Sequence, residues 1–357
     1  MTLDIIKVFF PTALCFFIGI GITPILTHYF YKYRLWKKKS RRDDSEKKES
    51  DKVSHVFKQV HNEVGELSTP RVGGVVIWIS VAVTLFIVFL ISIIFPSDLT
   101  RKLNFLSRNQ TILPFFTLIF AALVGLVDDA LQIAGKGSYA LDSIVYRKVK
   151  IVTLVVLGAL VGWWFYSKLG MSSLAIPFSD MRLELGLLFI PAFIIVMLAT
   201  FSGSVIDGID GLSGGVLATI FSAYAVIAFF QHQIDLAAFS GVVSGGILAF
   251  LWFNIPPARF YMGETGMLAL TVTLSTLAFL TDTVLVLPII AFPLVATSAS
   301  VIIQMSSKRL RGKRVFLVAP LHHHFEALGW PSYKVTMRYW IISVIFAIVG
   351  VVIALAG

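Results

Sequence analysis

The chain has 357 residues, of which 57% are hydrophobic and only 14% are charged, and its mean hydropathy is +0.85. A water-soluble globular protein of this length needs far more polar residues to cover its surface, so the composition excludes that class and predicts a protein dissolved in a lipid bilayer. The net charge of +10 would suit nucleic acid, but the sequence carries no nucleic-acid-binding motif, and the positions of the basic residues have another explanation.

About ten stretches are long and apolar enough to cross a hydrocarbon core of about 30 Å as α-helices. In chain order they lie near residues 5–31, 72–95, 111–127, 149–167, 186–204, 212–231, 235–253, 265–281, 283–304 and 337–356. We therefore expect an all-α membrane protein with a single polytopic domain over residues 1–357. The first stretch is too long for a signal peptide and is expected to stay as a span. It contains the only cysteine, Cys15, so disulfides contribute nothing.

Basic residues divide unevenly between the two sides that these spans define. Of the 30 Lys and Arg residues, 24 fall in segments 32–71, 128–150, 254–264 and 305–338, which all lie on one side. The positive-inside rule places that side in the cytoplasm and both termini in the periplasm. Residues 32–71 then form a basic cytoplasmic loop suited to anionic lipid head groups, and residues 305–336 form a second cytoplasmic loop.

Polar residues gather at four places, each at the expected cytoplasmic end of a span. These are Asp128 and Asp129 at the end of the third span, Asp207 and Asp210 after the fifth, Asn254 and Glu264 between the seventh and eighth, and His322, His323, His324 and Glu326 between the ninth and tenth. Each group has a plain structural interpretation as a helix end, an N-cap, a proline-rich turn or an incidental histidine run. Charged residues near a bilayer are costly and usually functional, so their gathering at one face favours a common site.

The residue types at this face suit phosphoryl transfer. Carboxylate and amide oxygens are hard ligands of the kind that Mg²⁺ prefers together with substrate phosphates. Three consecutive histidines do not easily bind one ion and lack the helical spacing of a zinc protease, so we do not expect a zinc site, and histidine side chains can donate to sugar or phosphate oxygens. No GxSxG motif supports a serine hydrolase. We therefore expect Mg²⁺-assisted transfer from a soluble donor to a lipid acceptor.

Five motifs resemble those of the polyprenyl-phosphate N-acetylhexosamine-1-phosphate transferases, over nearly the whole chain. They are STPRVGG, LVGLVDD, IDGIDGL, NIPPARFYMGETG and PLHHHFEALGW. The last, followed by VTMRYWIIS, resembles the phospho-N-acetylmuramoyl-pentapeptide transferase branch. The resemblance implies that UDP-N-acetylmuramoyl-pentapeptide and undecaprenyl phosphate give lipid I and UMP in peptidoglycan synthesis, with Mg²⁺ required. It also implies a homodimer in the bacterial cytoplasmic membrane, a lipid-accessible groove and a periplasmic hairpin in residues 171–185.

The resemblance further implies roles for residues at the matching positions. The catalytic set is Asp128, Asp129, Asp207 and His324, and the metal set is Glu264, Asp128 and Asp129, with Asn254 beside the metal. The substrate-binding set is Lys150, Ser204, Asp207, Asp210, Asn254, His322, His323 and His324. Asp128 is a candidate general base, although a phosphate monoester has a second pKa near neutrality and need not be deprotonated by the protein. Lys148 remains an alternative to Lys150.

The chain also departs from the family pattern. Ser204, Ile206 and Glu264 stand where Asn, Thr and Asp are common, Glu66 and Leu67 stand near a usual lysine, and Arg71 replaces the second Thr of TPTMGG. These changes leave two alternatives open. One is a transferase that uses UDP-N-acetylglucosamine to initiate a surface polysaccharide, and the other is an inactive membrane scaffold or transporter. The retained aspartate pairs argue against an inactive protein.

Overall fold

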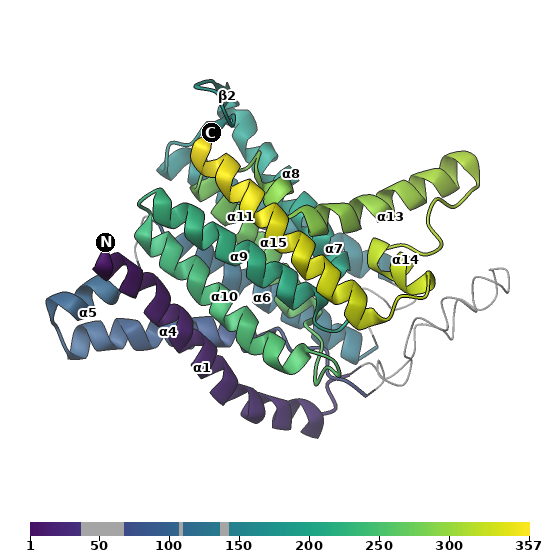
Figure 1. Ribbon diagram of the computed structural model, residues 1–357, viewed down its shortest axis with the longest axis horizontal. Coiled ribbons are helices and arrows are strands. Elements are labelled where there is room, and N and C mark those ends of the chain that lie inside the picture. The colour runs from purple at the N-terminus through teal and green to yellow at the C-terminus, as the bar shows by residue number, and fades with distance from the viewer. Residues whose placement is uncertain (37–67, 107–109, 136–142) are drawn as a thin grey trace.

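The computed structural model describes residues 1–36, 68–106, 110–135 and 143–357. Long helices packed side by side make up most of it (Figure 1). Nine of the described segments are long and apolar enough to cross a membrane. They are α1 (Thr2–Lys32), α4 (Val75–Ile94), α6 (Ile112–Ile133), α7 (Ser143–Lys168), α8 (Phe189–Ser202) with the 3-10 turns η1 (Gly186–Leu188) and η2 (Gly203–Ile206), α9 (Leu212–Phe230), α10 (Ile234–Asn254), α11 (Gly263–Leu280) and α15 (Ser332–Ala356). The expectation of an all-α membrane protein is confirmed.

The expected span at 283–304 is not one continuous helix, so that part of the prediction was wrong. The chain there forms α12 (Leu287–Ile290) and, after a break, α13 (Phe292–Arg311). Pro288 and Pro293 stand in the first turns of these two helices, where the proline ring and the missing N–H stop a preceding helix from running through. Helix α13 then leaves the bundle at an angle (Figure 1).

The third span also differs from the prediction. We expected it to end at residue 127, with Asp128 and Asp129 at its end, but α6 continues to Ile133. Both aspartates therefore lie within the helix, and both are buried. The helix runs on because partners on α7 and α11 satisfy the two carboxylates inside the bundle, so they do not need to reach water.

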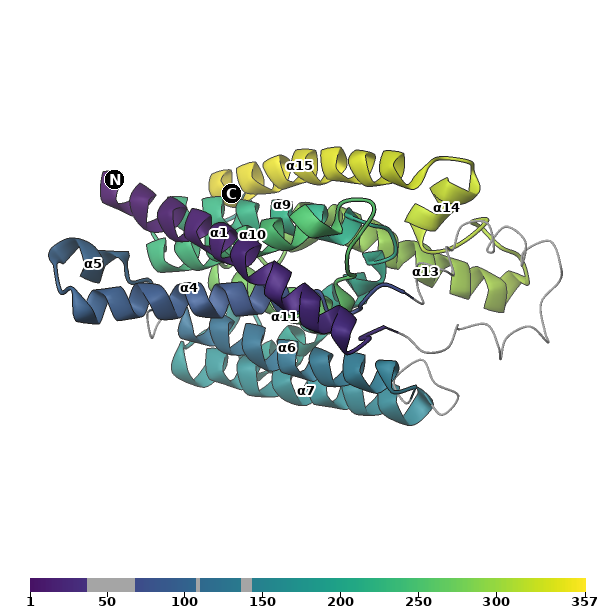
Figure 2. The same ribbon diagram turned by 90° about the horizontal axis from the view of Figure 1, so that it is seen from below.

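Both chain termini lie at one end of the bundle, and α14 (Leu321–Ala327) lies at the opposite end (Figures 1 and 2). This arrangement agrees with the expectation that both termini lie on the same side of the membrane. The assignment of that side to the periplasm stays a prediction. Near the C-terminus, β1 (Ser173–Ala175) and β2 (Arg182–Glu184) form the expected hairpin. The short helix α5 (Asp98–Leu103) lies at the same end. Most of the basic loop, including Glu66 and Leu67, lies outside the described residues.

Helices α9, α10 and α11 form the centre of the bundle, and nearly every residue of α11 is buried. Thr271, Ser275 and Thr276 of α11 donate their hydroxyl groups to carbonyls of the same helix, as when Thr271 Oγ1 donates to the Met267 carbonyl at 2.7 Å. Glycines let the neighbouring helices approach closely, since a Cβ on Gly245 of α10 would lie 2.3 Å from the Thr12 carbonyl oxygen of α1. This packing holds the N-terminus of α11 in a fixed place, where the polar residues meet.

Candidate active site

The TPRVGG segment packs along the turn that precedes α11. Gly73 donates a backbone hydrogen bond to the Tyr261 carbonyl at 2.9 Å, and the Tyr261 N–H donates to the Pro70 carbonyl at 2.8 Å. The contact is close enough to require glycine, because a Cβ on Gly74 would lie 2.4 Å from the Gly266 Cα. Two motifs far apart in the sequence are thereby joined at the start of α11.

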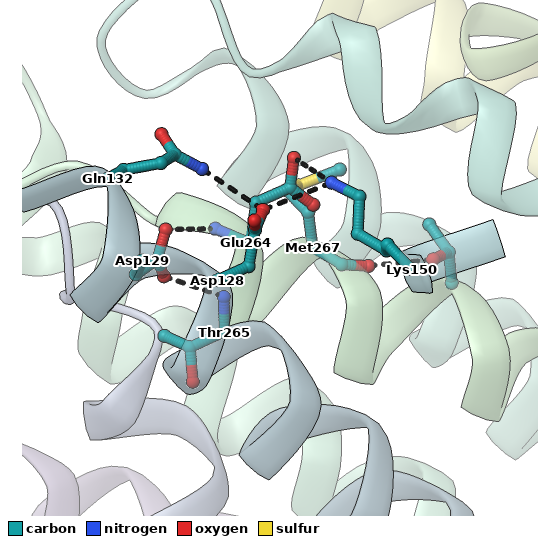
Figure 3. A network of polar contacts seen from close by, with 8 residues as sticks. Asp128, Asp129, Gln132, Lys150, Glu264, Thr265 and Met267 are labelled. Carbon is teal, nitrogen blue, oxygen red and sulfur yellow. Dashed lines mark hydrogen bonds and ion pairs between the residues drawn. The ribbon is translucent and has the colours of Figure 1, made fainter. Parts of the chain in front are cut away.

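Asp129 holds the start of α11 from the neighbouring helix α6 (Figure 3). Its Oδ1 accepts a hydrogen bond from the Glu264 N–H at 3.0 Å, and its Oδ2 accepts one from the Thr265 N–H at 2.8 Å. The first amides of a helix have no partner within the helix and carry a partial positive charge, which a carboxylate stabilises. Asp129 is only 1% exposed, and each carboxylate oxygen is bonded to an amide, so it acts as a cap supplied across the helix interface.

Lys150 bridges two carboxylates beside this cap. Its Nζ lies 3.1 Å from Asp128 Oδ2 and 3.1 Å from Glu264 Oε1 (Figure 3). Gln132, one turn after Asp128 on α6, donates to the same Oδ2 at 3.0 Å. The choice of Lys150 over Lys148 agrees with this geometry, because Lys148 is exposed. Three helices, α6, α7 and α11, thus meet through one ammonium group.

The DGIDG loop between η2 and α9 carries two partly buried aspartates. Asp207 Oδ1 accepts a hydrogen bond from Ser213 Oγ at 2.7 Å, and Asp210 Oδ2 accepts one from the Ala258 N–H at 3.1 Å. Ser204 lies in η2, and its carbonyl accepts the Asp207 N–H at 3.2 Å. The loop is therefore tied to α9, to η2 and to the turn after α10.

Burial raises the pKa of Asp207, because desolvation disfavours its charged form. The hydrogen bond from Ser213 and the positive charge of Arg71 oppose this effect without cancelling it. Burial likewise raises the pKa of Asp210, against the opposing hydrogen bond from Ala258. Both groups therefore bind a proton at a higher pH than an exposed aspartate does.

Asn254 joins the same loop to the turn before α11. Its Oδ1 accepts the Gly211 N–H at 3.0 Å, and its Nδ2 donates to the Phe260 carbonyl at 2.9 Å. The side chain is 3% exposed, so its amide oxygen and nitrogen are engaged with the backbone inside the protein. The geometry supports a positioning role for Asn254, and its contact with metal or substrate stays a prediction.

His322 and His323 of α14 face the DGIDG loop. Their ring centroids lie 4.3 Å apart, and a Cβ on Gly208 would lie 2.5 Å from His322 Nε2 and 2.9 Å from His323 Nε2. His323 Nδ1 lies 2.7 Å from Glu326 Oε2, one turn later, which orients the ring. The structure thus brings two of the three histidines to the predicted aspartates.

His324 points in another direction from its two neighbours. Its Nδ1 accepts the Leu317 N–H at 3.2 Å, and its ring packs edge-on against Phe316 at a centroid distance of 5.5 Å. Adjacent helical residues project about 100° apart, which explains the division of the run. The proposed catalytic role of His324 stays a prediction.

Three further polar residues belong to this region and were not identified from the sequence. Gln132 bonds Asp128 at a spacing of four residues, a separation that places two side chains on one helix face. On α15, Thr336 Oγ1 and Trp340 Nε1 donate to backbone carbonyls of the DGIDG loop at 3.2 and 3.1 Å. Their spacing of four residues is a similar signal, but nothing in the sequence names the loop that they contact.

Residues 111–282 match the family model described as glycosyl transferase family 4. Three similar proteins carry the name phospho-N-acetylmuramoyl-pentapeptide-transferase. The one from Anoxybacillus flavithermus is 35% identical over 349 residues, 97% of each chain. The one from Geobacillus sp. is 38% identical over 288 residues, 80% of this chain and 83% of the relative, and the one from Bacillus subtilis is 32% identical over 350 residues, 97% of each. The resemblance seen in the motifs is confirmed, and the chain belongs to the phospho-N-acetylmuramoyl-pentapeptide-transferase family.

Proposed function

We propose that this protein transfers phospho-N-acetylmuramoyl-pentapeptide from its UDP derivative to undecaprenyl phosphate, forming lipid I and UMP at the cytoplasmic membrane of a bacterium. The family relation supports the transferase reaction. The observation that carries the site is the bridge of Lys150 between Asp128 and Glu264, directly beside the N-terminus of α11. Two carboxylates around one ammonium group leave an excess of negative charge, which favours a divalent cation that is bound together with phosphate oxygens.

The reaction forms one phosphorus–oxygen bond and breaks another. An oxygen of the acceptor phosphate bonds to the β-phosphorus of the UDP-sugar, and the bond from that phosphorus to the bridging oxygen breaks, so UMP leaves with the electron pair. Negative charge on the transferred group must be stabilised, and positioning and electrostatics do most of this work in phosphoryl transfer. Lys150 is held beside the site by Asp128 and Glu264, and its ammonium group would supply positive charge there once a ligand draws it from one of these carboxylates.

The residues present fit a magnesium ion, and we propose Asp128 and Glu264 as its ligands. Glu264 Oε2 is buried without a hydrogen-bond partner in the described part of the chain. Mg²⁺ usually takes one or two carboxylates and completes its shell with phosphates and waters, so this pair of carboxylates is sufficient for it. When bound, Mg²⁺ would neutralise charge on the phosphates. Asp129 is left out because amides occupy its oxygens.

The donor's nucleotide and sugar are proposed to bind along the DGIDG loop. Asp207 and Asp210 supply acceptors, and His322 and His323 lie against Gly208 in the middle of the loop. Imidazole groups donate to sugar and phosphate oxygens, and their charge adjusts near neutral pH. The proposed homodimer and lipid-accessible groove follow from the family resemblance.

The test is release of UMP by purified protein given undecaprenyl phosphate and one UDP-sugar. We expect release from the N-acetylmuramoyl-pentapeptide donor, none from UDP-N-acetylglucosamine, and none after chelation of Mg²⁺. Glu264→Gln should nearly abolish release and Glu264→Asp should retain part of it, whereas Asp180→Asn, at an exposed position of the hairpin, should behave as the parent. Release from UDP-N-acetylglucosamine alone would favour a polysaccharide-initiating enzyme, and no release from either donor would favour a scaffold.

A further inference from the structure

Arg71 lies in the TPRVGG segment, where its backbone is held on both sides. Its N–H donates to the Leu35 carbonyl at 3.0 Å. Its own carbonyl faces Gly263, the first residue of α11, where a Cβ would lie 1.9 Å from the Arg71 carbonyl oxygen and 2.7 Å from Asp129 Oδ2. Gly263 has φ +68°, so both its conformation and its surroundings require glycine. Arg71 and Asp129 therefore both lie against Gly263, at the start of α11.

The guanidinium group of Arg71 lies near two aspartates without an ion pair to either. Electrostatic attraction links it to Asp129 and to Asp207. Among the residues that the structure describes, however, none accepts a hydrogen bond from the buried Arg71 Nε–H. A buried donor of a charged group is costly to leave unpaired, so such a group in a polar site points to an acceptor that the described residues do not supply.

The carboxylates near Arg71 and the ammonium group of Lys150 are already engaged. Both oxygens of Asp129 bind amides of α11, and Asp207 Oδ1 binds Ser213. Lys150 is shared between two carboxylates, so it cannot bind a ligand fully without releasing one of them. Arg71 differs from Lys150 because the aspartates attract it electrostatically and no described residue accepts a hydrogen bond from its Nε–H.

We propose, on the basis of the function proposed above, that Arg71 binds the pyrophosphate of the UDP-linked donor through its Nε–H and a neighbouring guanidinium N–H. A guanidinium is planar and permanently charged, and two of its parallel N–H groups match two oxygens of a phosphate. Arg71 is thus a donor-binding residue that distinguishes a nucleotide from a nucleoside.

The experiment compares equilibrium binding of UDP and of uridine to the purified full-length protein by isothermal titration calorimetry. Arg71→Gln should weaken UDP binding by about 10- to 100-fold, the range expected for a charge-assisted hydrogen bond, and should leave uridine binding within about twofold. Arg71→Lys should recover only part of the loss, because lysine keeps the charge and loses the planar pair of donors. Arg259→Gln is the matched control, since Arg259 is exposed and rests 5.6 Å from the centre of the Phe253 ring.

Three results would overturn the assignment. If Arg71→Gln binds UDP as tightly as the parent does, Arg71 makes no phosphate contact, and the proposed reaction stands unaffected. If the variant loses UDP and uridine affinity equally and its melting temperature falls, Arg71 supports the fold. If the parent binds neither compound, the proposed donor is wrong, and this role of Arg71 falls with it. In turnover assays the KM for the UDP-sugar should rise by a larger factor than kcat falls.

Discussion

Asp128 and Asp129 are neighbours with the same chemistry, yet replacing each by asparagine should have different consequences. In Asp129→Asn the side chain keeps one acceptor oxygen and gains an NH₂ group, which then faces a backbone N–H of α11. One buried amide loses its acceptor. In Asp128→Asn the groups on Oδ2 are the side chains of Gln132 and Lys150, and an asparagine oxygen still accepts hydrogen bonds from them.

The size of the difference follows from these contacts. A buried N–H without an acceptor costs about 1–3 kcal/mol, and the lost attraction between a carboxylate and a helix N-terminus adds about 0.3–2 kcal/mol. Neutralisation also removes the cost of burying a charge, which offsets part of this sum. We therefore expect Asp129→Asn to lower the free energy of unfolding by about 1–3 kcal/mol, or the melting temperature by about 2–6 °C. Asp128→Asn should lower the melting temperature less.

The assay pairs thermal unfolding of the purified protein, followed by circular dichroism, with release of UMP. Both variants should lose about a hundredfold or more in turnover, Asp128→Asn because it removes a carboxylate positioned for charge stabilisation, and Asp129→Asn because it releases the start of α11, which carries Glu264. Asp180→Asn, at an exposed position of the hairpin, serves as the control for the substitution itself. If Asp129→Asn has the melting temperature of the parent and Asp128→Asn has a lower one, Asp129 does not act as a cap of α11.

Three further predictions concern the DGIDG loop and the topology. The pKa of Asp207 is raised above its ordinary 3.8 by burial, so its favourable contribution to stability is present below pH 3.8 and is lost as the pH rises through the raised pKa. The Asp207→Asn variant should therefore have a higher melting temperature than the parent at pH 8 and the same melting temperature near pH 4, and its turnover should fall. Equal melting temperatures at pH 8 would contradict this prediction. Gly208→Ala should lower UMP release at least about tenfold, because its methyl group would lie 2.5 Å from His322 Nε2; Gly21→Ala, which has open space around it, should not. Cysteines placed in residues 40–60 and 311–320 should be labelled only once the inner face is accessible, and labelling of intact cells from outside would reverse the topology.

The membrane class, most helix positions and the composition of the site follow from local sequence. A span is recognised from about 20 consecutive side chains, and its length is set by the bilayer, so α10 was expected at 235–253 and lies at Ile234–Asn254. The motifs at the ends of the expected spans predicted which polar residues lie together at one end of the bundle. The hairpin at 171–185 was likewise expected and is present. The break at Pro293 could have been anticipated from the same reasoning, since proline in a helix interior removes a hydrogen bond.

The separate roles of the polar residues could not be predicted from the sequence, because each role depends on which neighbouring helix the side chain faces. Asp128 and Asp129 are adjacent in an apolar helix, and a rotation of about 100° between neighbours directs one to Lys150 of α7 and the other to the amides of α11. The same rotation separates His324 from His322 and His323. Some of these contacts join residues more than a hundred positions apart, as between Asp129 and Thr265. Local sequence specifies the direction of a side chain around its own helix, whereas the partner in that direction is set by how the helices pack.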